Sequence, residues 1–205
     1  MKHFVFIGDS VTDSNRKRSK KYAGTEAALG HGWVKILAET ALSDHSVWNR
    51  GFSGYRTADI LIDSDIWPEE VFTADVTTLM VGINDIWHTF KQHSPYHEQE
   101  IVQRFEELII RLKTRTVQLI VMEPVALVCG EVDEHWFSKM TSLFLQFKQV
   151  CNQEKVQWLS LQKSLEKVVK NKPEEYLHDG VHPSDIGHQW LAEQWLAQVP
   201  TTLFQ

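Results

Sequence analysis

Several features that define common protein classes are missing from this sequence. It has two cysteines in 205 residues, Cys129 and Cys151, which are too few for a disulfide framework and lack the spacing of a metal site. No apolar run approaches the roughly 18 residues that cross a membrane. The apolar stretch before Gly8 is too short for a secretory signal peptide. These absences predict a cytoplasmic protein with reduced thiols and no membrane partner.

Positive charge is also scarce. The formal net charge is -6, so no nucleic-acid partner is expected. The one basic run, Arg16-Lys17-Arg18 followed by Lys20-Lys21, is typical of a solvated loop rather than of a phosphate site. The ten histidines include no His-Glu-x-x-His pair, and His88, His93 and His97 are expected in solvated loops. We therefore expect no metal and no cofactor.

Familiar nucleophile and nucleotide motifs are absent as well. No serine lies in a Gly-x-Ser-x-Gly elbow, which argues against the α/β-hydrolase fold. No P-loop and no Gly-x-Gly-x-x-Gly follows the first apolar run, so nucleotide binding of those kinds is excluded.

What the sequence does contain is an alternation of apolar strands and amphipathic helices. This alternation predicts a parallel sheet covered by helices on both faces, within one domain of residues 1–205. The polar segment 9–31 has no clear periodicity and is predicted to be a loop. The predicted strands are 4–7, 46–48, 76–81, 117–122 and 156–161, and the predicted helices are 32–42, one capped by Thr57, 101–112, 137–151, 162–170 and 184–197.

Unusual polar clusters follow three of the predicted strands and precede the last helix. They are Gly8-Asp9-Ser10, Asn49-Arg50-Gly51, Gly82-Ile83-Asn84-Asp85 and Asp179-Gly180-Val181-His182. The carboxyl ends of parallel strands lie on one edge of a sheet, where ligands bind in open α/β folds. We therefore expect the four clusters to meet at one site.

The first and last clusters contain the groups that ester hydrolysis requires. Ser10 is the candidate nucleophile, and His182 is the base that would take its proton, because imidazole titrates near neutral pH. Asp179 precedes His182 by three residues, so a single turn can bring its carboxylate to Nδ1–H of the ring. Taken singly, Ser10 also fits a helix cap and the Asp179–His182 pair a surface contact.

The middle clusters contain donors for the negative charge that develops on the carbonyl oxygen. The candidates are the N–H of Ser10, the N–H of Gly51 and the side-chain amide of Asn84. A glycine at position 51 lets the backbone approach a substrate closely. The alternatives are a turn glycine at position 51 and a helix-capping turn at Asn84-Asp85. All of these groups together, each at a strand end or in the last loop, favour the catalytic interpretation.

The same four clusters resemble the sequence blocks of the GDSL-type, or SGNH, hydrolases. The resemblance implies Ser10 as nucleophile, Gly51 and Asn84 in the oxyanion hole, and Asp179 and His182 as the other two members of the triad. It also implies a flavodoxin-like three-layer α/β/α sandwich with about five parallel strands. An enzyme of this superfamily needs no metal.

Further stretches look like the bacterial acetylxylan esterases of this superfamily, namely Ile7 to Asp13 with Arg16, Gly30-His31-Gly32-Trp33 and Gly82 to Trp87. This implies a serine esterase that removes acetyl groups from xylo-oligosaccharides or related sugars through an acyl-enzyme. Trp87 has three roles open to it: stacking on a sugar ring, forming the wall of a small acyl pocket, or packing in the core.

Two rival functions stay open. One is a lysophospholipase or thioesterase acting on longer acyl esters, which the polar segment 11–31 does not favour. The other is a flavodoxin-like binding module without catalysis, against which the intact set of Ser10, Asp179 and His182 speaks.

The last predicted helix is expected to direct Ile186, Trp190 and Leu191 toward the core. Trp190 and Trp195 lie five positions apart and so do not share one face. One of the two is expected to pack inward and the other to meet a partner subunit, which would make the protein a homo-oligomer.

Overall fold

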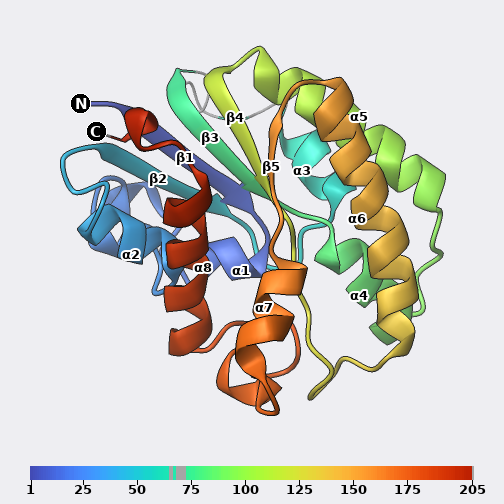
Figure 1. Cartoon of the computed structure of the whole chain (residues 1–205). Coiled ribbons are helices and arrows are strands. Elements are labelled where there is room, and N and C mark those ends of the chain that lie inside the picture. The colour runs from blue at the N-terminus through green and yellow to red at the C-terminus, as the bar shows by residue number, and fades with distance from the viewer. Residues whose placement is uncertain (65–66, 68–72, 205) are drawn as a thin grey trace.

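Five strands form one parallel sheet, which confirms the predicted fold class (Figure 1). The computed structural model describes residues 1–64, 67 and 73–204. Across the sheet the strand order is β2-β1-β3-β4-β5, which is the flavodoxin-like arrangement. The strands are β1 (His3–Gly8), β2 (Ser46–Gly51), β3 (Ala74–Met80), β4 (Thr116–Met122) and β5 (Gln157–Leu159).

Helices cover both faces of this sheet. They are α1 (Ser10–Asp13), α2 (Trp33–Glu39), α3 (Thr57–Asp63), α4 (Ile83–Lys91), α5 (Glu98–Lys113), α6 (His135–Gln153), α7 (Gln162–Val169) and α8 (Asp185–Gln198). Figure 1 shows α2 and α8 packed together on one face, with α3, α5 and α6 on the other. Among the described residues, no helix has both the length and the apolar character that crossing a membrane requires.

Aromatic side chains pack β1 firmly into the centre of the molecule. The ring of Phe6 meets Trp33 of α2 edge-on at 5.1 Å and lies 5.9 Å from the ring of Trp195 in α8. On the other face, Phe105 of α5 stacks on Phe147 of α6 at 3.8 Å. Burying each such side chain contributes about 1.5–3 kcal/mol. The strand that leads into Ser10 is therefore held rigidly.

The strand register brings three carboxyl ends level with one another. Gly8 at the end of β1 pairs with Gly51 of β2 and with Met80 of β3. The residues that follow these strands consequently emerge side by side at one edge of the sheet, as the sequence predicts.

Two short helices were not predicted from the sequence. The segment after β1 does not begin as a loop, because α1 starts at Ser10, with the Asp9 carboxylate accepting the N–H of Val11 at 3.0 Å. Likewise α4 starts at Ile83, directly after β3, and places His88 half-buried on a helix rather than in a solvated loop. A helix of one turn is too short to show a periodicity, which explains the first error.

The last helix corrects the expectations about tryptophan. Trp190 and Trp195 are both buried, so the prediction that one of them meets a partner subunit is wrong. The indole N–H of Trp195 donates to Thr78 Oγ1 of β3 at 3.0 Å. Ile186 is 53% exposed rather than inward, because its neighbour Gly187 takes the inward place against the carbonyl oxygen of Tyr176.

Candidate active site

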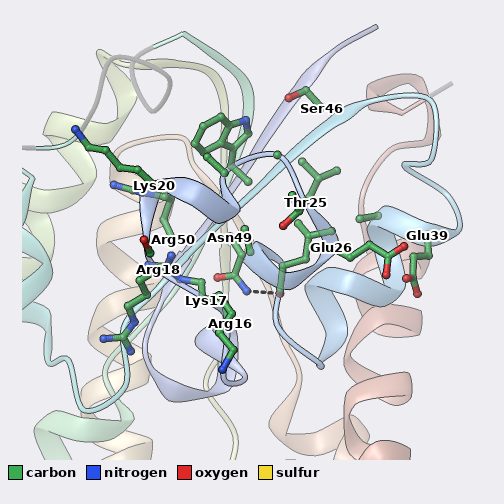
Figure 2. A pocket seen from close by; sticks show the side chains of 18 of the residues that line it. Arg16, Lys17, Arg18, Lys20, Thr25, Glu26, Glu39, Ser46, Asn49 and Arg50 are labelled. Atoms are coloured by element: carbon green, nitrogen blue, oxygen red, sulfur yellow. Dashed lines mark hydrogen bonds between the residues drawn. The ribbon is translucent and has the colours of Figure 1, made fainter.

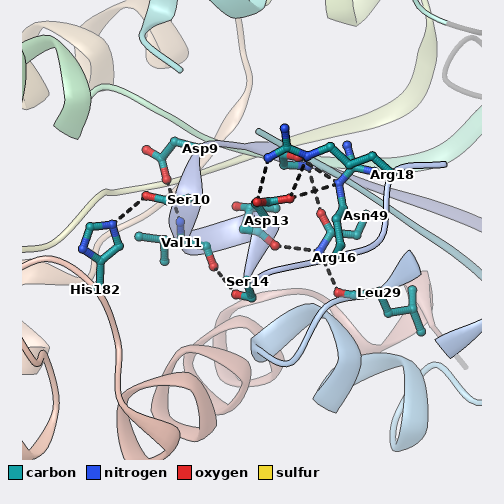
Figure 3. A network of polar contacts seen from close by, with 12 residues as sticks. Asp9, Ser10, Val11, Asp13, Ser14, Arg16, Arg18, Leu29, Asn49 and His182 are labelled. Carbon is teal, nitrogen blue, oxygen red and sulfur yellow. Dashed lines mark hydrogen bonds and ion pairs between the residues drawn. The ribbon is translucent and has the colours of Figure 1, made fainter. Parts of the chain in front are cut away.

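The structure brings the three predicted triad residues together. Ser10 Oγ lies 2.9 Å from Nε2 of His182 (Figure 3), and Nδ1 of His182 lies 2.6 Å from Oδ2 of Asp179. Ser10 is the first residue of α1, whereas Asp179 and His182 lie in the loop before α8. These distances match the arrangement of nucleophile, base and orienting carboxylate in a serine triad.

The loop that carries the base is stabilised by its own short-range hydrogen bonds. Asp179 Oδ1 accepts the N–H groups of Val181 at 3.0 Å and of His182 at 2.8 Å. Gly180 has a φ of +93°, and a Cβ there would lie 2.6 Å from the carbonyl oxygens of Leu127 and Cys129. A glycine is therefore required at this turn, and Asp179 points one oxygen at its own loop and the other at the imidazole.

Hydrogen bonding also sets the charge of Asp179. Partial burial raises the pKa of this carboxyl, but the N–H and ring of His182 and the N–H of Val181 outweigh that effect and hold the pKa below its usual range. Asp179 is therefore ionised at neutral pH, as the partner of an imidazole that receives a proton must be.

Ser10 is positioned by the turn between β1 and α1. Asp9 caps α1, so that Ser10 occupies its first turn and faces His182. Asp9 Oδ2 is buried and has no hydrogen-bond partner in the described part of the chain. Burial raises the pKa of Asp9 to about 7, opposed mainly by the hydrogen bond from Val11. Ser10 thus follows directly after a desolvated carboxyl.

Asn84 lies in the first turn of α4 with one amide hydrogen available. Its Nδ2 donates to the carbonyl oxygen of Tyr55 at 3.0 Å, and an amide nitrogen carries a second N–H. The neighbouring Asp85 accepts both the N–H and the hydroxyl of Thr57 at 2.9 Å, so that Thr57 anchors α4 instead of capping α3. The cap of α3 is Arg56 with Asp59.

The N–H of Gly51 already makes a hydrogen bond within the protein. Its N–H donates to Oδ1 of Asn49 at 2.8 Å, and a Cβ at this position would lie 2.1 Å from the backbone nitrogen of Asp13. The glycine lets α1 pack against β2, and the N–H that was predicted to bind substrate already has an acceptor. Sequence reasoning could not foresee this, because two glycines, Gly51 and Gly54, follow Asn49 in the same segment.

Gly54 is the other glycine of that segment. The N–H of Tyr55 donates to the carbonyl oxygen of Phe52 at 3.1 Å, which closes a turn with Gly54 at its third position and a φ of +82°. Within the described residues, the N–H of Gly54 donates to no protein group. The turn adjoins Asn84, whose amide binds Tyr55.

Trp87 lies beside the base. Its ring meets the imidazole of His182 at 5.7 Å and the ring of Trp136 at 5.5 Å, both edge-on. The indole is half-buried, so one part packs in the molecule while another part stays accessible next to His182.

Arg16 is a residue of this region that sequence reasoning missed. Its side chain is buried, and its Nε donates to the carbonyl oxygen of Gly51 at 2.8 Å and lies 3.4 Å from Oδ1 of Asp13. In Figure 3 this network lies to the right of Ser10, with His182 to the left of it. The prediction of a solvated basic loop is therefore wrong for Arg16, although Lys17, Lys20 and the rest of the run are exposed.

Known proteins resemble this chain along nearly its whole length. An acetylxylan esterase of Geobacillus stearothermophilus is 28% identical over 209 residues, covering 95% of this chain and 92% of that protein. A crystal structure of an acetylxylan esterase from this organism has a TM-score of 0.81 at 26% identity, covering 96% and 93% of the two chains. A structure described as a putative GDSL-like lipase from Parabacteroides merdae has a TM-score of 0.85 at 24% identity, covering 98% and 95%.

The family model supports the same relationship. Residues 6–190, which contain Ser10, Asp179 and His182, match the GDSL-like Lipase/Acylhydrolase family. The chain therefore belongs to this family of carboxylic ester hydrolases.

Proposed function

We propose that the protein is a serine esterase that removes small acyl groups, acetyl above all, from acylated xylo-oligosaccharides or related sugars. The observation that carries this proposal is the chain of hydrogen bonds from Ser10 through His182 to Asp179, at 2.9 Å and 2.6 Å. This arrangement activates a hydroxyl that is otherwise a poor nucleophile.

In the first half of the reaction, Ser10 Oγ attacks the carbonyl carbon of the ester. Nε2 of His182 takes the hydroxyl proton, and Asp179 stabilises the imidazolium through Nδ1–H. The tetrahedral intermediate then collapses: the bond to the sugar oxygen breaks, and His182 gives its proton to that oxygen. The products of this half are the free sugar hydroxyl and an acetylated Ser10.

Water completes the cycle. His182 takes a proton from a water molecule, whose oxygen attacks the acyl carbon of the modified Ser10. Collapse of the second intermediate returns the proton to Ser10 Oγ and releases the carboxylic acid. The same three residues therefore serve both halves, with His182 acting in turn as base and acid.

For the oxyanion we assign three donors: the N–H of Ser10, the second amide hydrogen of Asn84 and the N–H of Gly54. Gly54 replaces Gly51 in this role because the N–H of Gly51 already donates to Asn49. Donors that are fixed before reaction stabilise the developing charge most, and losing one typically costs a factor of roughly 100–1,000 in rate.

The acetyl-sugar preference is supported by two features. The similar esterase of Geobacillus stearothermophilus is described as an acetylxylan esterase, and one of its solved variants as an acetyl-xylooligosaccharide esterase. Trp87, whose ring lies edge-on to His182 at 5.7 Å, offers a flat apolar wall beside the base. Such a wall limits the space for an acyl chain and presents a surface for a sugar ring.

A series of esters tests the proposal. We expect kcat/KM on p-nitrophenyl acetate to exceed that on the octanoate at least tenfold, and acetate to be released from acetylated xylo-oligosaccharides. Faster cleavage of the long-chain ester would indicate a lysophospholipase or thioesterase instead. Absence of turnover on every ester, with wild-type and Ser10→Ala protein alike, would leave only a binding module.

A further inference from the structure

A cavity that none of Ser10, Asp179 and His182 lines lies along β2, the strand at one edge of the sheet. It has a volume of about 1000 Å³, is partly open, and is bordered by β2, the segment 16–29 and the end of α2 (Figure 2). Neither Ser10 nor His182 lines it. Its size is sufficient for a small organic ligand, since such sites span about 300–1,000 Å³.

Positive charge is concentrated in the lining of this cavity. The two acidic side chains there, Glu26 and Glu39, lie 3.6 Å and 3.3 Å from Nζ of Lys35 and so already have a cation beside them. The basic side chains are Arg16, Lys17, Arg18, Lys20 and Arg50. Figure 2 shows Glu26 and Glu39 across the cavity from these basic side chains. In a chain of net charge -6, such a cluster of basic side chains indicates a site for an anion.

Two of these guanidinium groups, those of Arg16 and Arg18, share one carboxylate. Arg16 and Arg18 contact the same carboxylate, that of Asp13, at 3.4 Å and 2.8 Å. Arg16 is 8% exposed, and its Nη2 has no partner in the described part of the chain. Burial, followed by the charge of Arg50, lowers the pKa of Arg16 to about 10. A bound anion would relieve this mutual repulsion.

An aromatic surface lies next to the cations. Trp48 and Arg50 occupy alternate positions of β2, so their side chains leave the strand on the same face. Both residues line the cavity, and the indole is half-buried. A ligand with an anionic group and a ring can therefore contact both at once.

We propose that this cavity binds the phosphate monoester of a sugar-sized molecule, at a site separate from the ester-cleaving one. A phosphate monoester carries about -1.5 to -2 charges at neutral pH and several acceptor oxygens, which suits several guanidinium groups better than a single carboxylate does. The planar guanidinium fork binds such oxygens in pairs. The site does not depend on the triad, since the two share no residue.

Calorimetry with glucose 6-phosphate tests this proposal. We expect one molecule to bind per chain, with glucose not binding and glucuronate binding at least tenfold more weakly. Arg18→Gln and Arg50→Gln should each weaken binding at least fivefold, and Lys20→Gln provides a third variant on an exposed side chain if Arg50→Gln fails to fold. Arg104→Gln removes an exposed arginine of α5, paired with Glu100 at 3.1 Å, and should bind as the wild type does.

The outcomes separate the two sites. Binding that is lost in Arg18→Gln while turnover of p-nitrophenyl acetate stays within twofold of wild type supports the proposal. No saturable binding of glucose 6-phosphate, tighter binding of glucuronate, or equal binding by wild type and Arg18→Gln would each overturn it. Failure of the esterase assay alone leaves the binding result standing, because the calorimetry needs no turnover.

Discussion

The loop 177–183 and the segment 13–18 both border the candidate active site, but different forces hold them. In the loop, Asp179 binds N–H groups two and three residues away, and Leu177 pairs with Pro183. In the segment, Arg16 is buried against Asp13 and the carbonyl oxygen of Gly51, 35 positions along the chain. The first arrangement is local chemistry visible in a short motif, whereas the second exists only after β2 has packed beside α1.

Asp179→Asn changes the side chain that binds both the loop 177–183 and the ring of His182. We expect kcat on p-nitrophenyl acetate to fall by about 10⁴-fold, because an amide neither fixes the tautomer of His182 nor stabilises the imidazolium. Steady-state kinetics at pH 8 measure the effect. Asp44→Asn, at an exposed position, is the matched control and should leave kcat unchanged. A fall of less than tenfold in Asp179→Asn would remove the residue from the triad.

Arg16→Gln removes the buried guanidinium that holds the segment 13–18. We expect the free energy of unfolding to drop by about 3 kcal/mol, because the carbonyl oxygen of Gly51 loses a buried donor and Asp13 keeps only Arg18 as a partner. Arg18→Gln, which removes a half-exposed partner of the same carboxylate, should cost less than about 1 kcal/mol. Urea denaturation compares the two. Equal losses would mean that burial does not distinguish these arginines.

Asn84→Ala and Asn49→Ala sharpen the contrast between catalysis and packing. Asn84→Ala should lower kcat by a factor of roughly 100–1,000 with little change in KM, because it removes an oxyanion donor. Asn49→Ala should instead destabilise the fold by about 2–3 kcal/mol, since its amide binds the carbonyl oxygens of Thr12 and Leu29 and accepts the N–H of Gly51. Steady-state kinetics and thermal unfolding of both variants measure these effects. A large loss of stability in Asn84→Ala, or a large loss of kcat in a stable Asn49→Ala, would contradict the two assignments.

Asp9→Asn gives the smallest expected effect, and it depends on pH. The folded-state pKa of Asp9, about 7, lies above its ordinary value of 3.8. The contribution of Asp9 to the free energy of unfolding is therefore largest at low pH and is lost as the pH rises through 7. The asparagine variant has no such loss and can still accept the N–H of Val11. Its stability relative to wild type should therefore rise by about 1 kcal/mol between pH 6 and pH 8. Thermal unfolding at both pH values measures this, and a constant difference would contradict the burial argument.

The sheet and the closeness of Asp179 to His182 could be predicted from sequence because their signals are local, whereas their catalytic roles stay a prediction. Alternating apolar runs indicate parallel strands, and the three-residue spacing of Asp179 and His182 fits one turn. The choice between Gly51 and Gly54 could not be made, since it depends on Asn49 accepting one N–H. Helix α4 was missed because its first turn carries Asn84 and Asp85, which are buried polar residues rather than an apolar stripe.

The remaining predictions were wrong because they depend on packing between distant parts of the chain. Trp190 and Trp195 lie five positions apart on α8, yet both are buried, and the ring of Trp195 packs against Phe4 of β1 and Phe204 near the end of the chain. The buried position of Arg16 in a basic run has no local signature at all. Such residues acquire their environment from partners far along the chain.

The hydrogen bond between Ser10 and His182 joins residues 172 positions apart. During synthesis, Ser10 leaves the ribosome first, and all five strands are complete at residue 159. A nascent chain at that stage can hold a finished sheet but lacks His182, the proposed base for Ser10. Under the proposed mechanism, ester cleavage begins only when the loop 177–183 has been made and has docked, so the onset of turnover reports the docking of this loop rather than the formation of the sheet.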